Sequence, residues 1–205
     1  MSIFKLLENM KHFRTYLSVI VLIASMTLIS CSKDDDEAVN VKPSENIMTT
    51  LLQEPTWTQT TASAVSWELG YVFSTSSTGK ITKLSCKMPE PGSYTVSLWD
   101  QTTKTLLRQK TLEQSTPEKF VESGIDEFLV EKDKKYVISI NTVVGGSAKK
   151  FFTISNANTN IFPIARGSIL VQSSVYKAIA TPKFPDGGAE TGRMYGFADF
   201  TFIPD

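Results

Sequence analysis

From about residue 47 onward, the chain consists of short segments in which apolar and polar residues alternate. Tyr94, Val96 and Leu98 share one side of such a segment, and residues 136–140 and 198–202 repeat the pattern. A period of two residues is that of a strand with one buried face. No later segment keeps the spacing of an amphipathic helix over three turns. The pattern therefore predicts an all-β chain.

Turn residues divide this part of the chain at short intervals, as expected for a sandwich or a jelly roll. We predict one antiparallel β-sandwich, jelly-roll-like, over residues 47–205. Recognition is expected on its two longer connections, 156–167 and 181–193, because long loops on a rigid sandwich usually carry binding. The predicted strands are residues 67–75, 80–88, 93–99, 105–112, 119–123, 127–130, 136–141, 151–154, 169–180 and 195–203.

The first thirty residues have the plan of a secretory signal. Lys11, His12 and Arg14 precede an uncharged apolar run at 17–29, which is shorter than the about 20 residues that a membrane-spanning helix needs. We therefore expect residues 1–30 to be removed. The sequence does not distinguish Met1 from Met10 as the initiating methionine.

Residues 28–31, Leu-Ile-Ser-Cys, resemble a lipobox, the cleavage and lipidation motif of bacterial lipoproteins. The resemblance implies that Cys31 becomes the N-terminus and carries acyl chains such as palmitate, which together anchor a protein firmly to a membrane. The alternative is an ordinary signal peptide with an accidental cysteine.

The acidic run at 34–37 resembles the export signal that sends Bacteroidetes lipoproteins to the outer face of the outer membrane. This resemblance implies a lipid-anchored protein facing the extracellular side, with residues 31–46 as an acidic tether. The alternative is a solvated linker without an export role.

Charge and histidine content exclude several functions for the mature chain. Removal of residues 1–30 takes away Lys5, Lys11, Arg14 and Glu8, which leaves 21 − 3 = 18 basic and 21 − 1 = 20 acidic residues. This balance gives no reason to expect nucleic acid as a partner. His12, the only histidine, lies in the removed part, so histidine-based triads and histidine metal sites are excluded.

Cys86 is the cysteine that remains once Cys31 carries lipid, so no intramolecular disulfide is expected. It alternates with Leu84 and Met88, which favours a small buried side chain over a reactive thiol.

Several motifs along the chain resemble a bacterial β-sandwich domain of unknown function, found in secreted and surface proteins and often beside carbohydrate-active modules. They are WELGYVF at 67–73, GKIT at 79–82, VSLWD at 96–100 with LL at 106–107, KYVIS at 135–139, FP at 184–185 and FADFTF at 197–202. The resemblance spans most of residues 47–205 and departs at Cys86, where a larger aromatic is expected. The family has no agreed catalytic residues, so none is assigned to this chain.

Aromatic side chains are the best candidates for a binding site, because an amphipathic ring can stack on a sugar face. The candidates are Trp57, Trp67, Trp99, Tyr176, Phe184 and Tyr195. Trp67 and Trp99 are expected to pack in the core or to cover a sheet. Phe184 and Tyr195 flank a glycine-rich loop that also holds Asp186 and Arg193, so these four residues form the predicted ligand site.

Catalysis and metal binding have weaker support. A glycosidase needs two facing carboxylates, and Glu68, Asp100, Asp186, Glu190 and Asp199 could each be solvated or cap a turn instead; Asp199 is expected on the sheet surface. Asp186 and Glu190 leave a structural calcium site open, without EF-hand spacing. No cofactor, metal ligand or catalytic residue is assigned.

The sequence leaves three functional hypotheses. The leading one is a non-catalytic recognition module at the cell surface that binds glycan. The alternative is a protein-interaction or structural subunit of an outer-membrane uptake or adhesion complex. A glycan-active hydrolase is the third.

Overall fold

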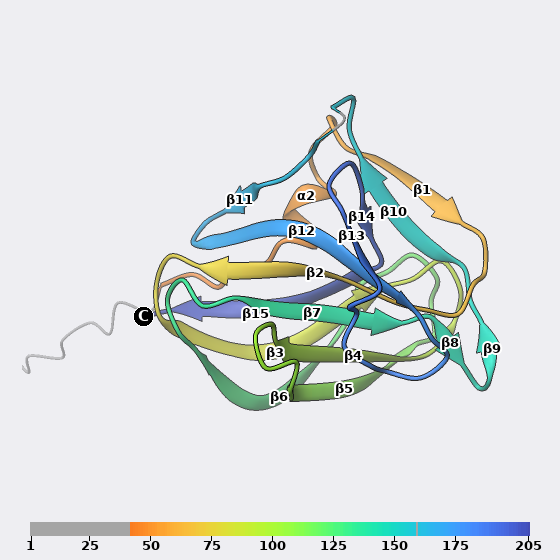
Figure 1. The fold of residues 1–205 in the computed structure, drawn as a ribbon, viewed down its shortest axis with the longest axis horizontal. Coiled ribbons are helices and arrows are strands. Elements are labelled where there is room, and N and C mark those ends of the chain that lie inside the picture. The colour runs from red at the N-terminus through yellow and green to blue at the C-terminus, as the bar shows by residue number, and fades with distance from the viewer. Residues whose placement is uncertain (1–41, 159) are drawn as a thin grey trace, which may run out of the picture. The chain divides into compact units, whose positions relative to one another are not determined.

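The computed structural model describes residues 42–158 and 160–205, which form an antiparallel β-sandwich with a short helix at its side (Figure 1). The predicted all-β sandwich is therefore confirmed. Cys31, the acidic run and the segment expected to be removed lie outside the described residues. Within the described part of the chain, no helix is both long and apolar enough to cross a membrane.

The larger layer, here called the large sheet, is a seven-stranded antiparallel sheet with the order β11-β12-β2-β7-β4-β5, to which β13 adds beside β12. Its strands are β11 (Ile164–Arg166), β12 (Ile169–Ala178), β2 (Trp67–Thr75), β7 (Tyr136–Asn141), β4 (Gly92–Asp100), β5 (Leu106–Gln114) and β13 (Gly188–Glu190).

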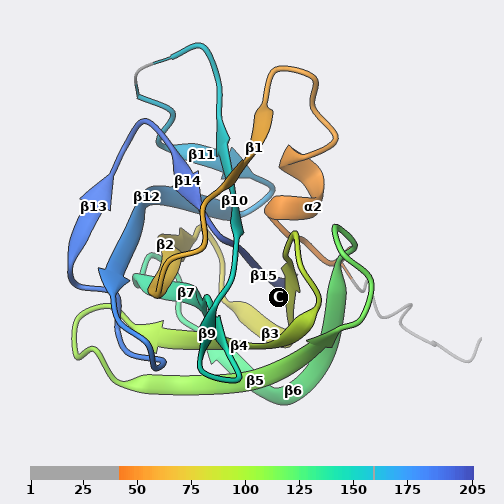
Figure 2. The ribbon, with the colours of Figure 1, turned by 90° about the vertical axis from the view of Figure 1, so that its right-hand side faces the viewer.

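Two narrower sheets lie against the large sheet (Figure 2). The small sheet has the order β15-β3-β6, with β15 (Phe197–Pro204), β3 (Gly79–Lys87) and β6 (Val121–Val130). The capping sheet has the order β1-β10-β14, with β1 (Thr58–Ala62), β10 (Phe151–Ser155) and β14 (Met194–Tyr195). Helix α2 (Met48–Leu51) and the hairpin of β8 (Val143–Val144) and β9 (Ser147–Ala148) complete the described elements.

Aromatic rings from the large and small sheets meet in the core between them. Tyr71, Phe73 and Tyr136 project inward from the large sheet, and the ring centroids of Phe73 and Phe200 are 4.4 Å apart across the layers. Burial of each such side chain contributes roughly 1.5–3 kcal/mol. Cys86 is also fully buried, and burial raises the pKa of its thiol to about 12, which confirms its predicted packing role.

Most predicted strands are present, with differences at their ends. β2 and β7 have the predicted bounds, while residues 119–130 contain the single strand β6 rather than two. Residues 195–203 divide at Gly196, whose φ of 64° turns the chain between β14 and β15. The remaining elements were not predicted, because they are short or, in β1, largely polar: α2, β1, β8, β9, β11 and β13.

Glu45 belongs to the sandwich, although it falls in the segment 31–46 that was expected to be a tether. It pairs with Phe202 of β15 through backbone hydrogen bonds in both directions. Its Oε2 accepts hydrogen bonds from the backbone N–H of Ser168 at 2.8 Å and from its hydroxyl at 2.6 Å. The chain is therefore held against β15 before α2 begins.

The prediction that Asp199 lies on the sheet surface is wrong, because α2 and the segment before it cover that part of β15. Asp199 is fully buried and accepts hydrogen bonds from the N–H of Ile47 at 3.2 Å, the N–H of Met48 at 2.9 Å and the hydroxyl of Tyr71 at 3.3 Å. Burial raises its pKa to about 6, although the backbone donors favour the ionised form. Asp199 thus joins the first turn of α2 to both main layers.

Gly70 gives a direct test of how closely β2 and β7 approach. A Cβ atom at residue 70 would lie 2.0 Å from the carbonyl oxygen of Ile138 and 2.8 Å from the Cα of Ser139, both backbone atoms. Because these atoms cannot move aside cheaply, Gly70→Ala should lower the free energy of unfolding by about 1–3 kcal/mol, measured by urea denaturation.

Gly124→Ala is the matched control, because a Cβ atom at residue 124 of β6 meets nothing within 4 Å. It should change the free energy of unfolding by about 0.5 kcal/mol or less. Equal stabilities of the two variants would contradict the close approach of β2 and β7.

Candidate functional site

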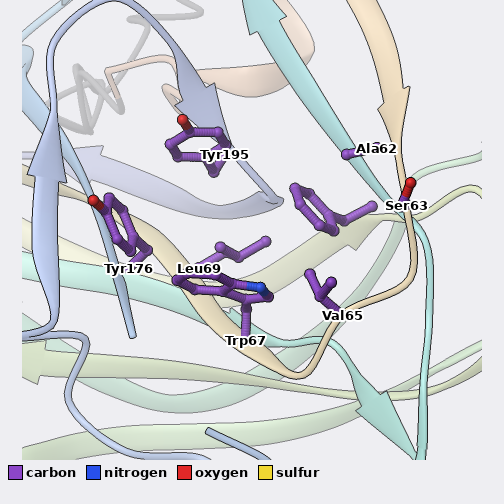
Figure 3. Close-up of a pocket in the computed structure, with 8 residues that line it drawn as sticks. Ala62, Ser63, Val65, Trp67, Leu69, Tyr176 and Tyr195 are labelled. Atoms are coloured by element: carbon purple, nitrogen blue, oxygen red, sulfur yellow. The ribbon is translucent and has the colours of Figure 1, made fainter. Parts of the chain in front are cut away.

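An aromatic pocket of about 420 Å³ lies where the capping sheet meets one end of the large sheet. This volume is in the range of small-molecule sites, about 300–1,000 Å³. Figure 3 shows Tyr176 and Tyr195 on one side of the space, Ala62, Ser63 and Val65 on the other, and Trp67 and Leu69 between them. The lining residues are Ala62, Ser63, Val65, Trp67, Leu69, Phe151, Tyr176 and Tyr195.

Three half-buried rings form the aromatic side of the pocket. Trp67 of β2 and Tyr176 of β12 have ring centroids 5.2 Å apart with planes at 69°, and Tyr176 and Tyr195 of β14 are 5.9 Å apart at 86°. Such edge-to-face contacts are favourable and fix the rings relative to one another. The aromatic side is therefore already formed without a ligand.

The other lining residues of the pocket are mostly apolar. Leu69 is 2% exposed and Phe151 is 7% exposed, so both belong to the main core as well as lining the pocket. Ala62 pairs with Phe151 in the register of β1 and β10, and Val65 follows in the connection to β2, where it is 37% exposed. The opening thus presents an apolar residue to solvent.

Gly196 sets the position of Tyr195. Its φ is 64°, and a Cβ atom there would lie 2.9 Å from the Cβ of Leu69 and 3.0 Å from Cγ2 of Ile140. Glycine removes both difficulties, since it adopts positive φ without strain and has no Cβ atom. The chain can therefore press β14 onto the end of the large sheet, with Tyr195 over the pocket.

Charged groups lie near Tyr195 without lining the pocket. Burial raises the pKa of the Tyr195 hydroxyl; the Glu190 carboxylate raises it further, while Arg193 acts in the opposite direction. Glu190 also accepts a hydrogen bond from the N–H of Gly192 at 2.9 Å. The residues lining the pocket include no charged side chain, so its interior is neutral.

The structure does not bring the four predicted ligand residues together. Tyr195 lines the pocket, and Arg193 is exposed near it. Phe184 lies instead on the outer face of the large sheet, where it packs edge-to-face on Trp99 with centroids 6.1 Å apart. Asp186 forms ion pairs with Lys104 at 2.9 Å and Lys177 at 2.6 Å.

Phe184 and Asp186 fasten a segment that we call the cover loop, residues 179–187. Its first and last backbone N–H groups donate to the carbonyl oxygens of Ser66 and Tyr176. Beneath Phe184, the side chains of Val72, Trp99 and Val137 form a small apolar cluster that is separate from the main core. The loop that was expected to bind ligand therefore covers a sheet face.

Beside this cluster, Glu68 is buried within a polar network. Its Oε1 accepts a hydrogen bond from the Ser139 hydroxyl at 2.5 Å, its Oε2 accepts one from the Asn141 amide at 3.0 Å, and Trp99 Nε1 donates to Ser139 at 2.8 Å. Burial raises the pKa of Glu68 to about 7, against the effect of these donors and of the Lys183 backbone.

The other carboxylates have structural partners. Asp100 accepts hydrogen bonds from the N–H groups of Thr102 and Thr103 and pairs with Lys134 at 3.3 Å. Hydrogen bonds, led by that of the Thr103 backbone, lower the pKa of Asp100. Both carboxylate oxygens of Asp186 contact lysine ammonium groups, so the calcium hypothesis lacks a free ligand there. Over residues 42–158 and 160–205, no cluster of three acidic, cysteine or histidine residues could hold a metal ion.

Of the aromatic candidates, Trp67, Tyr176 and Tyr195 converge on the pocket, whereas Trp57, Trp99 and Phe184 do not line it. Trp99 is 7% exposed and covers the outer sheet face, one of the roles expected for it. Five further residues line the pocket without having been predicted from the sequence: Ala62, Ser63, Val65, Leu69 and Phe151.

A family model described as "Domain of unknown function (DUF4082)" matches residues 53–195. The chain belongs to this family. All eight residues that line the pocket fall inside the DUF4082 range, whereas β15 follows it. No curated protein matches the chain.

The buried Glu68 predicts that stability depends on pH. Its pKa in the folded protein, about 7, exceeds the ordinary value of 4.5, so the folded state binds more protons between these values. Stability should therefore fall as pH rises from 4.5 to 7, by up to about 3 kcal/mol from this residue.

Glu68→Gln should remove this part of the pH dependence, measured by urea denaturation at pH values from 4 to 8. Asp199 also makes stability fall as pH rises, and it remains in the variant. The effect of Glu68 is therefore the difference between the stability profiles of wild type and variant. Parallel profiles for wild type and variant would show that Glu68 does not titrate in this range.

Proposed function

We propose that this DUF4082 protein is a non-catalytic recognition module that binds glycan in the aromatic pocket. The observation that carries the proposal is the convergence of Trp67, Tyr176 and Tyr195 in a concave, neutral site. Sugar rings have apolar C–H faces that stack on aromatic side chains, while hydroxyl groups at the margin hydrogen-bond to polar groups. The lining side chains supply such polar groups in the Ser63 hydroxyl, the two tyrosine hydroxyls and the Trp67 indole N–H.

The shape of the site supports a small ligand over a protein partner. Protein partners usually bind an extended apolar patch of several hundred Å². The exposed large apolar residues of the described chain, Val65, Leu106, Leu129 and Leu170, lie on different segments. Only Val65 of these lines the pocket.

The absence of an acidic residue among those lining the pocket supports recognition rather than hydrolysis. Glycoside hydrolysis needs two carboxyl groups facing each other across the substrate, roughly 5–10 Å apart. The three buried carboxylates, Glu68, Asp100 and Asp199, have protein hydrogen-bond partners and do not line the pocket.

The proposed location is the outer membrane, with Cys31 as the lipid anchor and the sandwich facing the extracellular side. The motif at 28–31 and the acidic run after it support this part of the proposal. A surface position would give the pocket access to glycans outside the cell.

Binding to a glycan array tests the proposed function. The purified full chain should bind a subset of glycans, and Tyr195→Ala should weaken that binding by about tenfold, equal to about 1.4 kcal/mol, because a stacked ring is lost.

Leu129→Ala is the matched control, since residue 129 is 74% exposed and does not line the pocket. It should leave binding unchanged. Absence of glycan binding above background, or equal weakening by the two substitutions, would overturn the proposal.

Lipid anchoring has an independent test. Cys31→Ala removes the thiol that would carry the acyl chains, so the protein should leave the membrane fraction when cells are fractionated. Wild-type protein on intact cells should be trimmed by added protease. Retention of the variant in membranes would contradict the anchor, and protection of the wild type would contradict the outward orientation.

A further inference from the structure

The pocket has two chemically different sides, and this asymmetry suggests what the ligand carries. The rings of Tyr176 and Tyr195 form the aromatic side, Ala62 and Val65 lie across from them, and the Trp67 ring lies between (Figure 3). A flat, partly polar ring suits the aromatic side. The aliphatic side offers van der Waals contact with Ala62, with Val65 and with Phe151, which pairs with Ala62 in the register of β1 and β10. Hydrogen bonds there can come from the Ser63 hydroxyl and the Trp67 indole N–H.

The neutral interior excludes charged sugars as good ligands. A carboxylate, sulfate or ammonium group placed inside would lose water without gaining an oppositely charged partner, which is costly. Glu190 and Arg193 lie near Tyr195 with opposite charges, so they favour neither sign strongly. The group that enters the pocket should therefore be uncharged.

Resting on the proposed function, we propose that the pocket selects a neutral pyranose that bears a methyl group, such as a 6-deoxyhexose or an N-acetylated sugar. The C–H face of the sugar ring stacks on the aromatic side, and the methyl group contacts Ala62 and Val65. An ordinary hexose would instead place a hydroxyl against Ala62 and Val65, whose side chains cannot hydrogen-bond.

Matched pairs of sugars test this selection by calorimetry on the purified full chain. One pair is the methyl glycosides of L-fucose and L-galactose, which differ by one hydroxyl; the other is N-acetyl-D-glucosamine and D-glucose. At least one methyl-bearing member should bind about tenfold more tightly than its partner, as one added apolar group in a pocket allows. D-glucuronic acid should bind more weakly than D-glucose.

A variant then locates the selection on the aliphatic side. Val65→Thr keeps the shape of the side chain but replaces a methyl group with a hydroxyl, and residue 65 is 37% exposed, which limits any effect on folding. The preference within the responding pair should fall to about threefold or less. Val143→Thr, on hairpin strand β8 and outside the pocket, should leave the preference unchanged.

The outcomes separate this inference from the proposed function. Equal affinity within both pairs, tighter binding of D-glucuronic acid, or an unchanged preference in Val65→Thr would overturn the selection, while glycan binding itself would stand. No binding by any of these sugars would also overturn the selection if the array shows bound glycans. If no glycan on the array binds the protein, the proposed function would be overturned as well.

Discussion

The unequal width of the two main layers is the constraint on which the rest of this structure depends. The seven-stranded large sheet faces a three-stranded small sheet, so part of its apolar inner face would be exposed to water if nothing else covered it. The capping sheet and α2 cover this part, with Phe151, Phe152, Met48 and Leu51 entering the same core as the rings of the main layers. The pocket lies where this cover meets the end of β2.

Two buried carboxylates hold the elements that regular sheet pairing does not position. Asp199 binds the N–H groups at the start of α2, and Glu68 lies in a hydrogen-bonded network beside the cover loop. Each is costly to bury and is retained only because its oxygens have donors. The helix and the loop are therefore tied to the sandwich by polar contacts whose strength depends on protonation.

Alternation along the chain was sufficient to predict the strands that carry the core. β2 and β7 have the expected bounds because their inward residues are large and apolar. β1 could not be found in this way, since Thr58–Ala62 is mostly polar and its pairing partner, β10, begins at Phe151. The sequence around β1 carries no signal that it pairs with a strand so much later in the chain.

The candidate site was only partly predictable for the same reason. Tyr195 and Tyr176 were identified as aromatic candidates, but their meeting with Trp67 depends on the sharp turn at Gly196 and on the register of β12 against β2. The composition of the loop that contains Phe184 and Asp186 is equally suited to ligand binding and to covering a sheet. Asp186 forms ion pairs with Lys104, which is distant in sequence, and with Lys177 of β12. These ion pairs fasten the loop over the sheet.

The position of β15 along the chain affects how the domain can form. This strand supplies Phe200 and Phe202 to the core, pairs with both β3 and Glu45, and contributes Asp199. A nascent chain that stops before residue 197 lacks all of these contacts and leaves one edge of β3 open, which exposes it to aggregation. Folding is thus expected to be completed only after synthesis has passed this strand, and to be slow, because its contacts link distant parts of the sequence.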